Sequence, residues 1–254
     1  MRSEQQALSV DGVSAGPTTR PRLLPVPEDD EPPVAAGTDW DSFLPPAAAS
    51  AGWRRAQRMK RGLDVLISGL GLLAILPLLV LIALLVKLTS RGPVLYQSRY
   101  VGERGRSFVG YKFRSMVANA DDLKAEMAHL NHMNGPAFKI RNDPRVTRVG
   151  RFLRKYSLDE LPQLWNVVRG DMSLVGPRPP LPEEFEQFTD WQRGKLAVRP
   201  GITCYWQING RSEISDFDEW ATLDLKYIEE WSLWTDLKIL LRTIPAVLHG
   251  HGAY

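Results

Sequence analysis

The stretch KRGLDVLISGLGLLAILPLLVLIALLVKL, residues 60–88, decides the fold of this chain. No charged side chain occurs between Val65 and Val86, and an apolar run of this length is typical of a membrane segment. Because the run begins only at Val65, we do not expect a cleaved signal peptide. The segment therefore predicts a chain held at a membrane.

Pro77 lies near the middle of this run and governs how it meets the bilayer. A proline inside a helix removes a hydrogen bond and forces a kink. The arm before it, residues 65–76, would be about 18 Å long, more than the roughly 15 Å of one leaflet. The residues alone leave two geometries open: a hairpin that enters and leaves by one face, which we favour, and a kinked span. A buried helix of a soluble protein fits less well.

Basic side chains flank both ends of the run, and the positive-inside rule places such clusters on the cytoplasmic side. Arg54, Arg55, Arg58, Lys60 and Arg61 precede it, and Lys87, Arg91, Arg99, Arg104 and Arg106 follow it. Two basic ends favour the hairpin. Within the first flank we expect Lys60, Arg61 and Asp64 to lie at the headgroup level, with Asp64 paired to a base.

Composition divides the chain into three parts. Residues 1–50 hold eight of the nineteen prolines and predict a disordered tail, with Trp40–Leu44 as a short docking element. Residues 51–91 form the basic flank and the apolar segment. Residues 92–254 read as a compact domain of ordinary composition.

The single cysteine, Cys204, excludes an internal disulfide and a multi-cysteine metal site, which suits a reducing compartment. A net charge of +3 and a pI near 9.0 permit an anionic partner without identifying it. No aromatic platform or known motif supports nucleic acid as that partner.

Several elements of the domain can be predicted. Alternation in 94–97 and 108–113 predicts two strands around a turn at 102–105, with Lys112 and Arg114 on one face. Residues 116–133 read as an amphipathic helix. A second helix, opened by Asp143 and Pro144, combines an apolar face with arginines and could lie in the headgroup region. Two further helices are expected after residue 215, divided near residues 232–235; Trp220, Trp231 and Trp234 fit an interfacial belt or an ordinary core.

The stretch SLDELPQLW, residues 157–165, sets Asp159 beside Glu160. Ser157 and Glu160 match a capping box, but we prefer Asp159 as the cap, because Pro162 then falls in the first turn of the helix. The helix dipole would keep Asp159 ionised, and the helix would end at Gly170.

The loop GPRP, residues 176–179, is stiff enough to hold one arginine in place, and arginine binds phosphate through two hydrogen bonds. On the residues alone, however, a single arginine in such a loop is usually part of a plain surface turn. The side chains and loop residues that we expect to bind substrate are Lys112, Arg114, Arg154, Gly176, Pro177, Arg178, Pro179 and Arg199.

The order of these motifs resembles the bacterial sugar transferase family. The matching segments are KRGLDVLIS, the apolar run with its proline, YKFRSM, DPRVTRVGRFLRKYSLDELPQLWNV, GDMSLVGPRP, PGIT and DLKILLRT. The resemblance covers about residues 58–254. It implies a mainly α fold with a small β element, in which a re-entrant helix hairpin and amphipathic interfacial helices pack on a compact cytosolic catalytic domain.

The resemblance also implies an activity: transfer of a sugar phosphate from a UDP-sugar to undecaprenyl phosphate, with Mg²⁺. Asp159 matches the family's nucleophile, which forms an aspartyl-phosphosugar and releases UMP. Glu160 matches its partner at the metal, and Asp159 is expected there too. Arg178 matches the phosphate-binding arginine. Pro77 matches the proline of a re-entrant helix, which favours attachment to the cytoplasmic face of the inner membrane.

Two departures and one rival remain. Cys204-Tyr205 and Ile208-Asn209 stand where the family pattern has other residues, which puts sugar recognition by this stretch in doubt. We expect the proline-rich tail to take the place of the four additional membrane helices of longer relatives. A non-catalytic scaffold for polysaccharide assembly at the membrane is the alternative. The sequence does not identify the sugar, and it allows a homodimer without requiring one.

Overall fold

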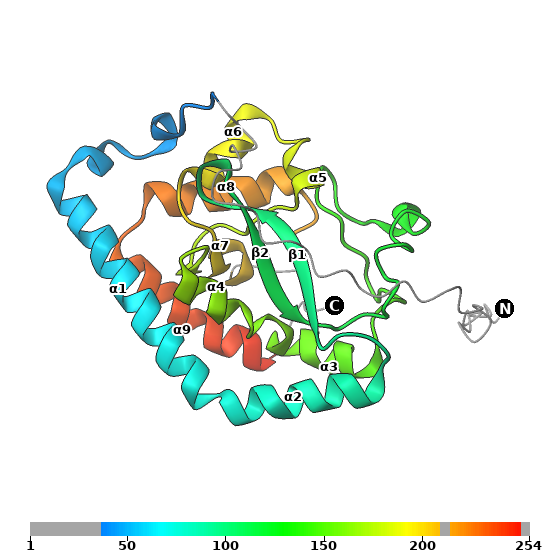
Figure 1. Cartoon of the computed structure of the whole chain (residues 1–254). Coiled ribbons are helices and arrows are strands. Elements are labelled where there is room, and N and C mark those ends of the chain that lie inside the picture. The colour runs from blue at the N-terminus through cyan, green and yellow to red at the C-terminus, as the bar shows by residue number, and fades with distance from the viewer. Residues whose placement is uncertain (1–36, 209–213, 250–254) are drawn as a thin grey trace.

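The computed structural model describes residues 37–208 and 214–249 (Figure 1). Two long helices, α1 (Ala51–Ala74) and α2 (Leu76–Thr89), run along the edge of the molecule and meet at Ile75 with a bend of 63°. The Ser50 side chain caps α1 by accepting a hydrogen bond from the Trp53 backbone N–H. Pro77 lies in the first turn of α2, where its missing N–H costs no helical hydrogen bond. The break expected at this proline is confirmed.

The bent pair exposes much of its apolar surface. Among the described residues, no single helix has the length and hydropathy of a membrane span, whereas α1 and α2 together do. Leu66, Leu70 and Leu73 of α1 and Leu81, Leu84 and Leu88 of α2 are exposed. One side of α2 instead packs on the domain, since Ile82 and Val86 are buried against Phe113 and Leu153. The pair therefore has one face on the protein and an apolar face without a protein partner among the described residues.

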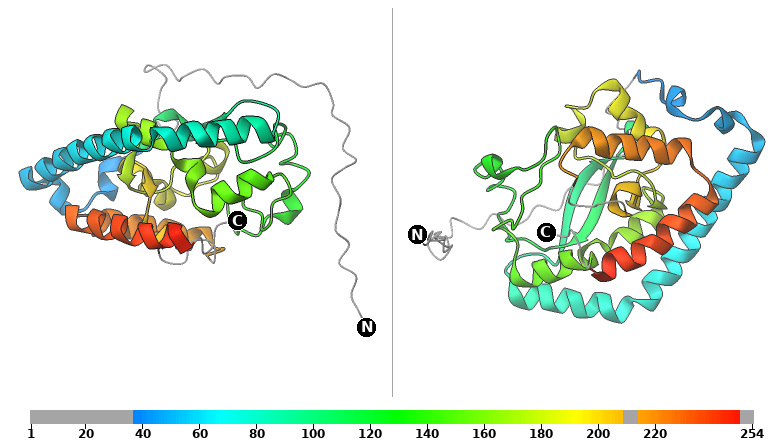
Figure 2. Two further views of the ribbon diagram at one scale, coloured as in Figure 1. Left: turned by 90° about the horizontal axis from the view of Figure 1, so that it is seen from below. Right: turned by 180° about the vertical axis from the view of Figure 1, so that it is seen from behind.

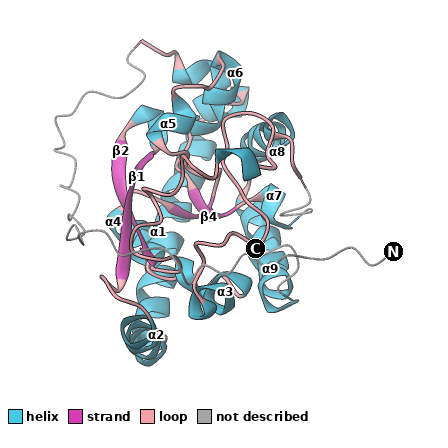
Figure 3. Cartoon of the chain, turned by 90° about the vertical axis from the view of Figure 1, so that its right-hand side faces the viewer, coloured by secondary structure: helices cyan, strands magenta, loops and turns pink. Residues whose placement is uncertain are grey.

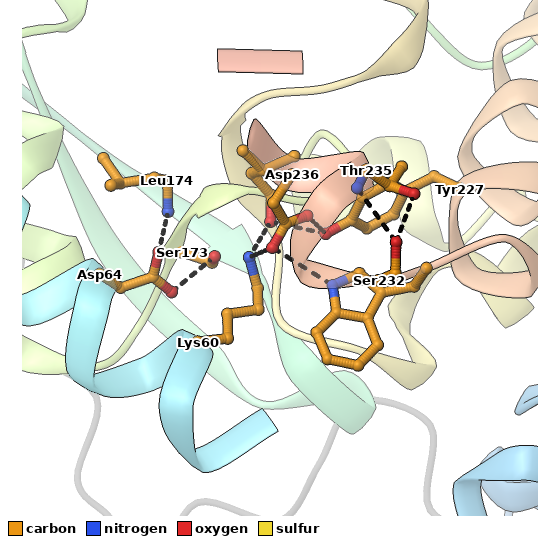
Figure 4. A network of polar contacts seen from close by, with 10 residues as sticks. Lys60, Asp64, Ser173, Leu174, Tyr227, Ser232, Thr235 and Asp236 are labelled. Carbon is orange, nitrogen blue, oxygen red and sulfur yellow. Dashed lines mark hydrogen bonds and ion pairs between the residues drawn. The ribbon is translucent and has the colours of Figure 1, made fainter. Parts of the chain in front are cut away.

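Buried polar contacts join α1 to the C-terminal helices (Figure 4). Lys60 Nζ lies 2.6 Å from Asp236 Oδ2 and donates a second hydrogen bond to the Val175 carbonyl at 3.0 Å. The Tyr227 hydroxyl and the Trp231 indole N–H donate to the same carboxylate at 2.8 and 3.2 Å. One cation and two neutral donors thus satisfy the buried Asp236, as burial of a carboxylate requires.

The other residues expected at the headgroup level also face the domain. Asp64 is buried and accepts hydrogen bonds from Ser173 Oγ at 2.7 Å and the Leu174 N–H at 3.2 Å. Arg61 donates to backbone carbonyls at the end of α4, including that of Val168 at 2.9 Å. Lys60, Arg61 and Asp64 thus bind the domain, and Asp64 is held by Ser173 and Leu174 rather than by the base that we expected. Their partners lie more than 100 residues further along the chain, where short-range patterns give no signal.

The strands β1 (Leu95–Val101) and β2 (Ser107–Phe113) form the expected antiparallel hairpin, with Leu95 opposite Phe113 and Val101 opposite Ser107. Its turn contains the 3₁₀ helix η3 (Glu103–Gly105), and Gly105 there adopts a left-handed φ of 77°. The hairpin lies on the opposite side of the molecule from α8 and α9 (Figure 3).

A second, parallel strand pair was not predicted from the sequence. β3 (Ser173–Val175) and β4 (Gly201–Thr203) align Ser173 with Gly201 and Val175 with Thr203. The Gly201 N–H donates to the Pro177 carbonyl at 2.9 Å, so the pair also holds the start of the GPRP loop. Each strand has only three residues, too few for a detectable alternation.

The remaining helices surround these strands. The C-terminal pair, α8 (Phe217–Glu229) and α9 (Leu233–His249), divides where the sequence predicts. Seen from below, α9 and the α1–α2 pair run along opposite edges of the molecule (Figure 2). Trp220 is buried and Trp231 is packed against the core, whereas Trp234 is exposed. The other helices are α3 (Arg148–Lys155), α4 (Gln163–Arg169), α5 (Pro182–Phe185), α6 (Asp190–Arg193), α7 (Tyr205–Ile208), and the 3₁₀ helices η4 (Ala128–Leu130), η5 (Leu158–Glu160) and η6 (Gly194–Ala197).

Two predicted helices differ from the structure. Residues 116–133 form successive turns and η4 rather than a helix, and Arg145 donates a hydrogen bond to the Ala120 carbonyl within this stretch at 3.0 Å. α3 begins at Arg148 rather than at Pro144, because Thr147 is its cap and accepts a hydrogen bond from the Gly150 N–H. Asp143 instead forms a buried ion pair with Arg145 at 2.7 Å.

The residues just before α1 pack on the domain. The 3₁₀ helices η1 (Trp40–Phe43) and η2 (Pro46–Ala49) precede it, and Trp40 is buried in a core cluster with Leu196. Asp41 pairs with Arg104 at 2.6 Å. Docking at Trp40–Leu44 thus agrees with the expectation, while the tail up to residue 36 lies outside the described residues.

Candidate active site

The acidic pair lies in η5, between α3 and α4. Ser157 adopts a left-handed φ of 52° and so turns the chain out of α3. Asp159 and Glu160 follow within a single 3₁₀ turn, and α4 begins only at Gln163 with Pro162 as its cap residue. Neither Ser157 nor Asp159 caps α4, so both capping predictions are wrong. The end of the helix at Gly170, which has a left-handed φ of 103°, is confirmed.

Asp159 is buried, with 8% of its surface exposed. Burial, followed by the neighbouring charge of Glu160, raises the pKa of Asp159 to about 6, against the lowering effects of Lys112 and Arg154. We expected a helix dipole to keep this carboxylate ionised. Burial and the charge of Glu160 instead determine its pKa, and both raise it. At pH 7 the group is still mainly ionised, but in an environment that disfavours its charge.

Lys112 connects the hairpin to this acidic pair. Its Nζ lies 2.7 Å from Glu160 Oε1. Burial would lower the pKa of Lys112, but Glu160, Tyr100 and Asp159 outweigh it and hold the pKa above its ordinary value. The lysine is therefore a permanent cation beside the two carboxylates.

A polar cavity opens beside Glu160. Its lining includes Lys112, Glu160, Gln163, Arg178, Trp206 and Gln207. The Arg178 guanidinium is held by Glu184, 3.5 Å away, and by the ring of Trp220, whose centroid lies 5.7 Å from Cζ. The cavity thus carries two fixed cations and one carboxylate, an arrangement suited to a phosphorylated ligand.

An apolar cavity lies on the other side of Glu160. Its apolar lining residues are Leu158, Leu161, Leu164, Ile202, Ile208, Ala246 and Val247, from the segment η5 to α4, β4, α7 and α9. The two cavities share Glu160, Ile202 and Gln207. A ligand with a charged head and an apolar chain could place its head at Glu160 and its chain in this second cavity.

The structure brings together only some of the predicted substrate-binding residues. Lys112, Arg178 and Pro179 line the polar cavity. Arg154 is close enough to influence Asp159, while it donates to Ser115 Oγ at 2.8 Å.

The other predicted residues lie elsewhere. Arg114 donates to the Ser90 carbonyl and hydroxyl, both at 2.8 Å, and so closes the end of α2. Arg199 pairs with Glu103 at 3.3 Å. Gly176 packs against the backbone of β4, and Pro177 accepts a backbone hydrogen bond there.

Several residues that line the polar cavity were not predicted from the sequence. They are Tyr100, Gln163, Ile202, Trp206 and Gln207, and Cys204 was noted only as a departure from a family pattern. Trp206 stacks on Trp220 with ring centroids 4.4 Å apart and an interplanar angle of 15°. Nothing in the segment PGITCYWQI, residues 200–208, placed Trp206 and Gln207 in one cavity with Lys112.

The burial of Asp159 should make the free energy of unfolding depend on pH. The carboxyl has a pKa of 3.8 when unperturbed and about 6 in the fold, so its ionisation opposes folding. This cost is absent below pH 3.8, grows between pH 3.8 and 6, and is complete above pH 6. We expect Asp159→Asn to raise the free energy of unfolding by about 1–3 kcal/mol at pH 8 and by almost nothing at pH 4. Denaturant titrations at both pH values check this, and an equal difference at the two would contradict it.

A family model and several known proteins match most of this chain. The family model for bacterial sugar transferases matches residues 55–250. The chain is 51% identical over 162 residues to galactosyl transferase CpsE of Streptococcus agalactiae, which covers 64% of this chain and 36% of the relative. It is 44% identical over 199 residues to the exopolysaccharide production protein ExoY of Rhizobium meliloti, covering 77% of this chain and 88% of the relative.

A third relative is the UDP-glucose:undecaprenyl-phosphate glucose-1-phosphate transferase of Escherichia coli, 42% identical over 203 residues, which covers 77% of this chain and 41% of the relative. The chain thus spans well under half the length of the first and third of these relatives and most of the second. The matched region includes η5, both cavities and the α1–α2 pair. This chain belongs to the bacterial sugar transferase family.

Proposed function

We propose that the protein transfers a sugar 1-phosphate from a UDP-sugar to undecaprenyl phosphate, as an early membrane step in the synthesis of an exopolysaccharide or related glycan. The observation that carries the proposal is the junction of a cationic polar cavity and an apolar cavity at Glu160, with Asp159 beside it. The Escherichia coli relative is named for UDP-glucose and undecaprenyl phosphate, and the donor and acceptor classes of the proposal follow that name.

The polar cavity is the proposed donor site. Lys112 and Arg178 offer positive charge from two sides of the cavity, and a diphosphate carries the matching negative charge. Neutralising the phosphate oxygens also lowers the repulsion that an attacking carboxylate would meet. Trp206 and Gln207 contribute an aromatic face and an amide to the same lining. They are therefore the residues that we expect to contact the sugar or the base.

Asp159 is the proposed nucleophile. Its carboxylate oxygen attacks the phosphorus that bears the sugar; an aspartyl O–P bond forms, the bond to the bridging oxygen breaks, and UMP leaves with the electron pair. A phosphate oxygen of undecaprenyl phosphate then attacks the same phosphorus and releases the carboxylate. No proton has to be removed from the nucleophile, because a carboxylate is ionised at neutral pH. Burial disfavours the charge of the free Asp159 carboxylate, and in the covalent intermediate the carboxyl group itself is no longer charged, since the remaining negative charge lies on the phosphoryl oxygens.

The acidic pair also fits a magnesium ion. Among the described residues no group of three or more His, Cys, Asp and Glu side chains forms a metal cluster. Mg²⁺ commonly takes only one or two carboxylates and completes its shell with water and substrate phosphate, so Asp159 and Glu160 are a sufficient oxygen donor set. When bound, the ion would neutralise charge on the diphosphate.

Membrane attachment is the last part of the proposal. Besides α1 and α2, α9 also exposes apolar side chains, those of Trp234, Leu237, Leu241 and Ile244. Exposed basic residues lie near both ends of the bent pair, including Arg55 and Arg58 in the first turns of α1, Lys87 in the last turn of α2 and Arg91 just after it. We propose a re-entrant hairpin at the cytoplasmic face of the inner membrane. The acceptor's phosphate would then lie at the level of Glu160.

The test is UMP release by the full chain in detergent, with undecaprenyl phosphate, Mg²⁺ and a panel of UDP-sugars. We expect one or a few donors to give UMP and an equimolar labelled lipid, with much weaker release when the lipid is omitted. Glu219→Gln, an exposed acidic change on α8, should match the wild type. A protein that binds membranes but releases no UMP from any donor would contradict the proposal and favour the scaffold alternative.

A further inference from the structure

Tyr100 lines the polar cavity, but the chemistry described above gives its side chain no role. The residue lies on β1, and only 8% of its surface is exposed. No described residue forms a hydrogen bond with its hydroxyl group. A buried tyrosine hydroxyl ordinarily has a partner, because an unpaired polar group loses its hydration without compensation. The hydroxyl is therefore a candidate contact for a ligand in this cavity.

The hairpin directs the Tyr100 ring across β2. Tyr100 is paired with Phe108, and Ser98 with Gly110, so these residues and Lys112 lie on one face of the hairpin. The ring stacks on Phe108, with centroids 5.7 Å apart. A Cβ on Gly110 would lie 2.6 Å from Tyr100 Cε2, so the ring occupies the space that this glycine leaves free. The ring thus leans from Phe108 toward Lys112.

The end of β1 is also joined to the GPRP loop. The N–H of Val101, the residue after Tyr100, donates to the Pro180 carbonyl at 2.9 Å. Pro180 is two residues beyond Arg178, so this hydrogen bond brings the strand beside the loop that carries the arginine. Tyr100, Lys112 and Arg178 line one cavity. The hydroxyl therefore faces the same ligand as the two cations.

We propose that the Tyr100 hydroxyl donates a hydrogen bond to a phosphate oxygen of a nucleoside diphosphate. The inference rests on the proposed function, since that function makes the polar cavity the donor site. A diphosphate bound by Lys112 and Arg178 has further oxygens that accept hydrogen bonds, and bonds to a charged oxygen are among the stronger ones. Phe108 and Gly110 fix the ring before the ligand arrives, so binding orders this side chain at little entropic cost.

The test is UDP binding, measured by calorimetry on the full chain in detergent with Mg²⁺. Tyr100→Phe removes the hydroxyl and keeps the ring, and we expect it to bind UDP about tenfold more weakly. Uridine, titrated as a competitor of UDP, has no phosphate and should bind both proteins equally. A tenfold loss for uridine as well would show that the hydroxyl contacts the nucleoside, and would overturn the inference.

The matched control is Tyr96→Phe, which makes the same change four residues earlier on the same face of β1. The Tyr96 hydroxyl donates to Asp121 at 3.2 Å, and Tyr96 lies outside the polar cavity. This variant should bind UDP like the wild type.

A second measurement separates binding from folding. The Tyr100 hydroxyl has no hydrogen-bond partner among the described residues, so Tyr100→Phe should unfold at the wild-type denaturant midpoint. The expected loss of affinity would then belong to a folded protein.

Two further results would overturn the inference: wild-type UDP affinity in a folded Tyr100→Phe protein, or an equal loss of affinity in Tyr96→Phe, which would indicate a general effect on the hairpin. If the wild type binds no UDP at all, the inference fails together with the proposed function. If UDP binding depends on Tyr100 but no UDP-sugar yields UMP, only the proposed function fails.

Discussion

Asp159→Asn is expected to lower sugar phosphate transfer by at least about 10³-fold, because an amide cannot form the ester with the phosphosugar. The fold should survive, since the replacement removes a buried charge that the pKa of about 6 shows to be unfavourable. Initial rates of labelled lipid formation measure the loss, with UDP affinity recorded alongside.

The matched control is Asp122→Asn, which makes the same change at an exposed residue in the turns after β2. It should leave the rate unchanged. A rate for Asp159→Asn within tenfold of the wild type would mean that another group attacks the phosphorus, or that transfer occurs in one step.

Gly201→Ala is expected to lower the free energy of unfolding by about 3 kcal/mol or more. A Cβ at this position would lie 2.0 Å from the Gly176 backbone nitrogen and 2.6 Å from the Val175 carbonyl carbon. Both atoms belong to backbone, so β3 and β4 would have to separate. The loop that begins at Gly176 carries Arg178, and donor binding should weaken as well.

Gly62→Ala provides the control within α1. A Cβ there meets no other atom within 4 Å, and alanine favours a helix over glycine by about 0.5–1 kcal/mol. Denaturant midpoints of the two variants should therefore move in opposite directions. Equal midpoints would show that the close approach of the two strands is not a constraint on the fold.

Local patterns predicted the parts of the fold that depend on neighbouring residues. The β1–β2 hairpin, the break at Pro77, the end of α4 at Gly170 and the division between α8 and α9 all follow from short-range rules. The helix expected over residues 116–133 failed because tertiary contacts override propensity there: Arg145 donates to the Ala120 carbonyl at 3.0 Å.

Long-range contacts decide the features that could not be predicted. Lys60 and Asp64 looked like headgroup residues, yet their partners Asp236 and Ser173 are brought to them by the fold. Asp159 and Glu160 could be singled out as an adjacent acidic pair, but the burial that sets the pKa of Asp159 depends on the assembled structure. Trp206 likewise lines the cavity only because the fold places β4 and α7 beside it.

The most direct test of the account is exchange of labelled UMP into the UDP-sugar donor in the absence of undecaprenyl phosphate. A covalent phosphosugar on Asp159 predicts exchange by the wild type at a rate comparable with overall transfer, and none by Asp159→Asn. Absence of exchange in a preparation that transfers sugar phosphate to lipid, or equal exchange by both proteins, would contradict Asp159 as the nucleophile.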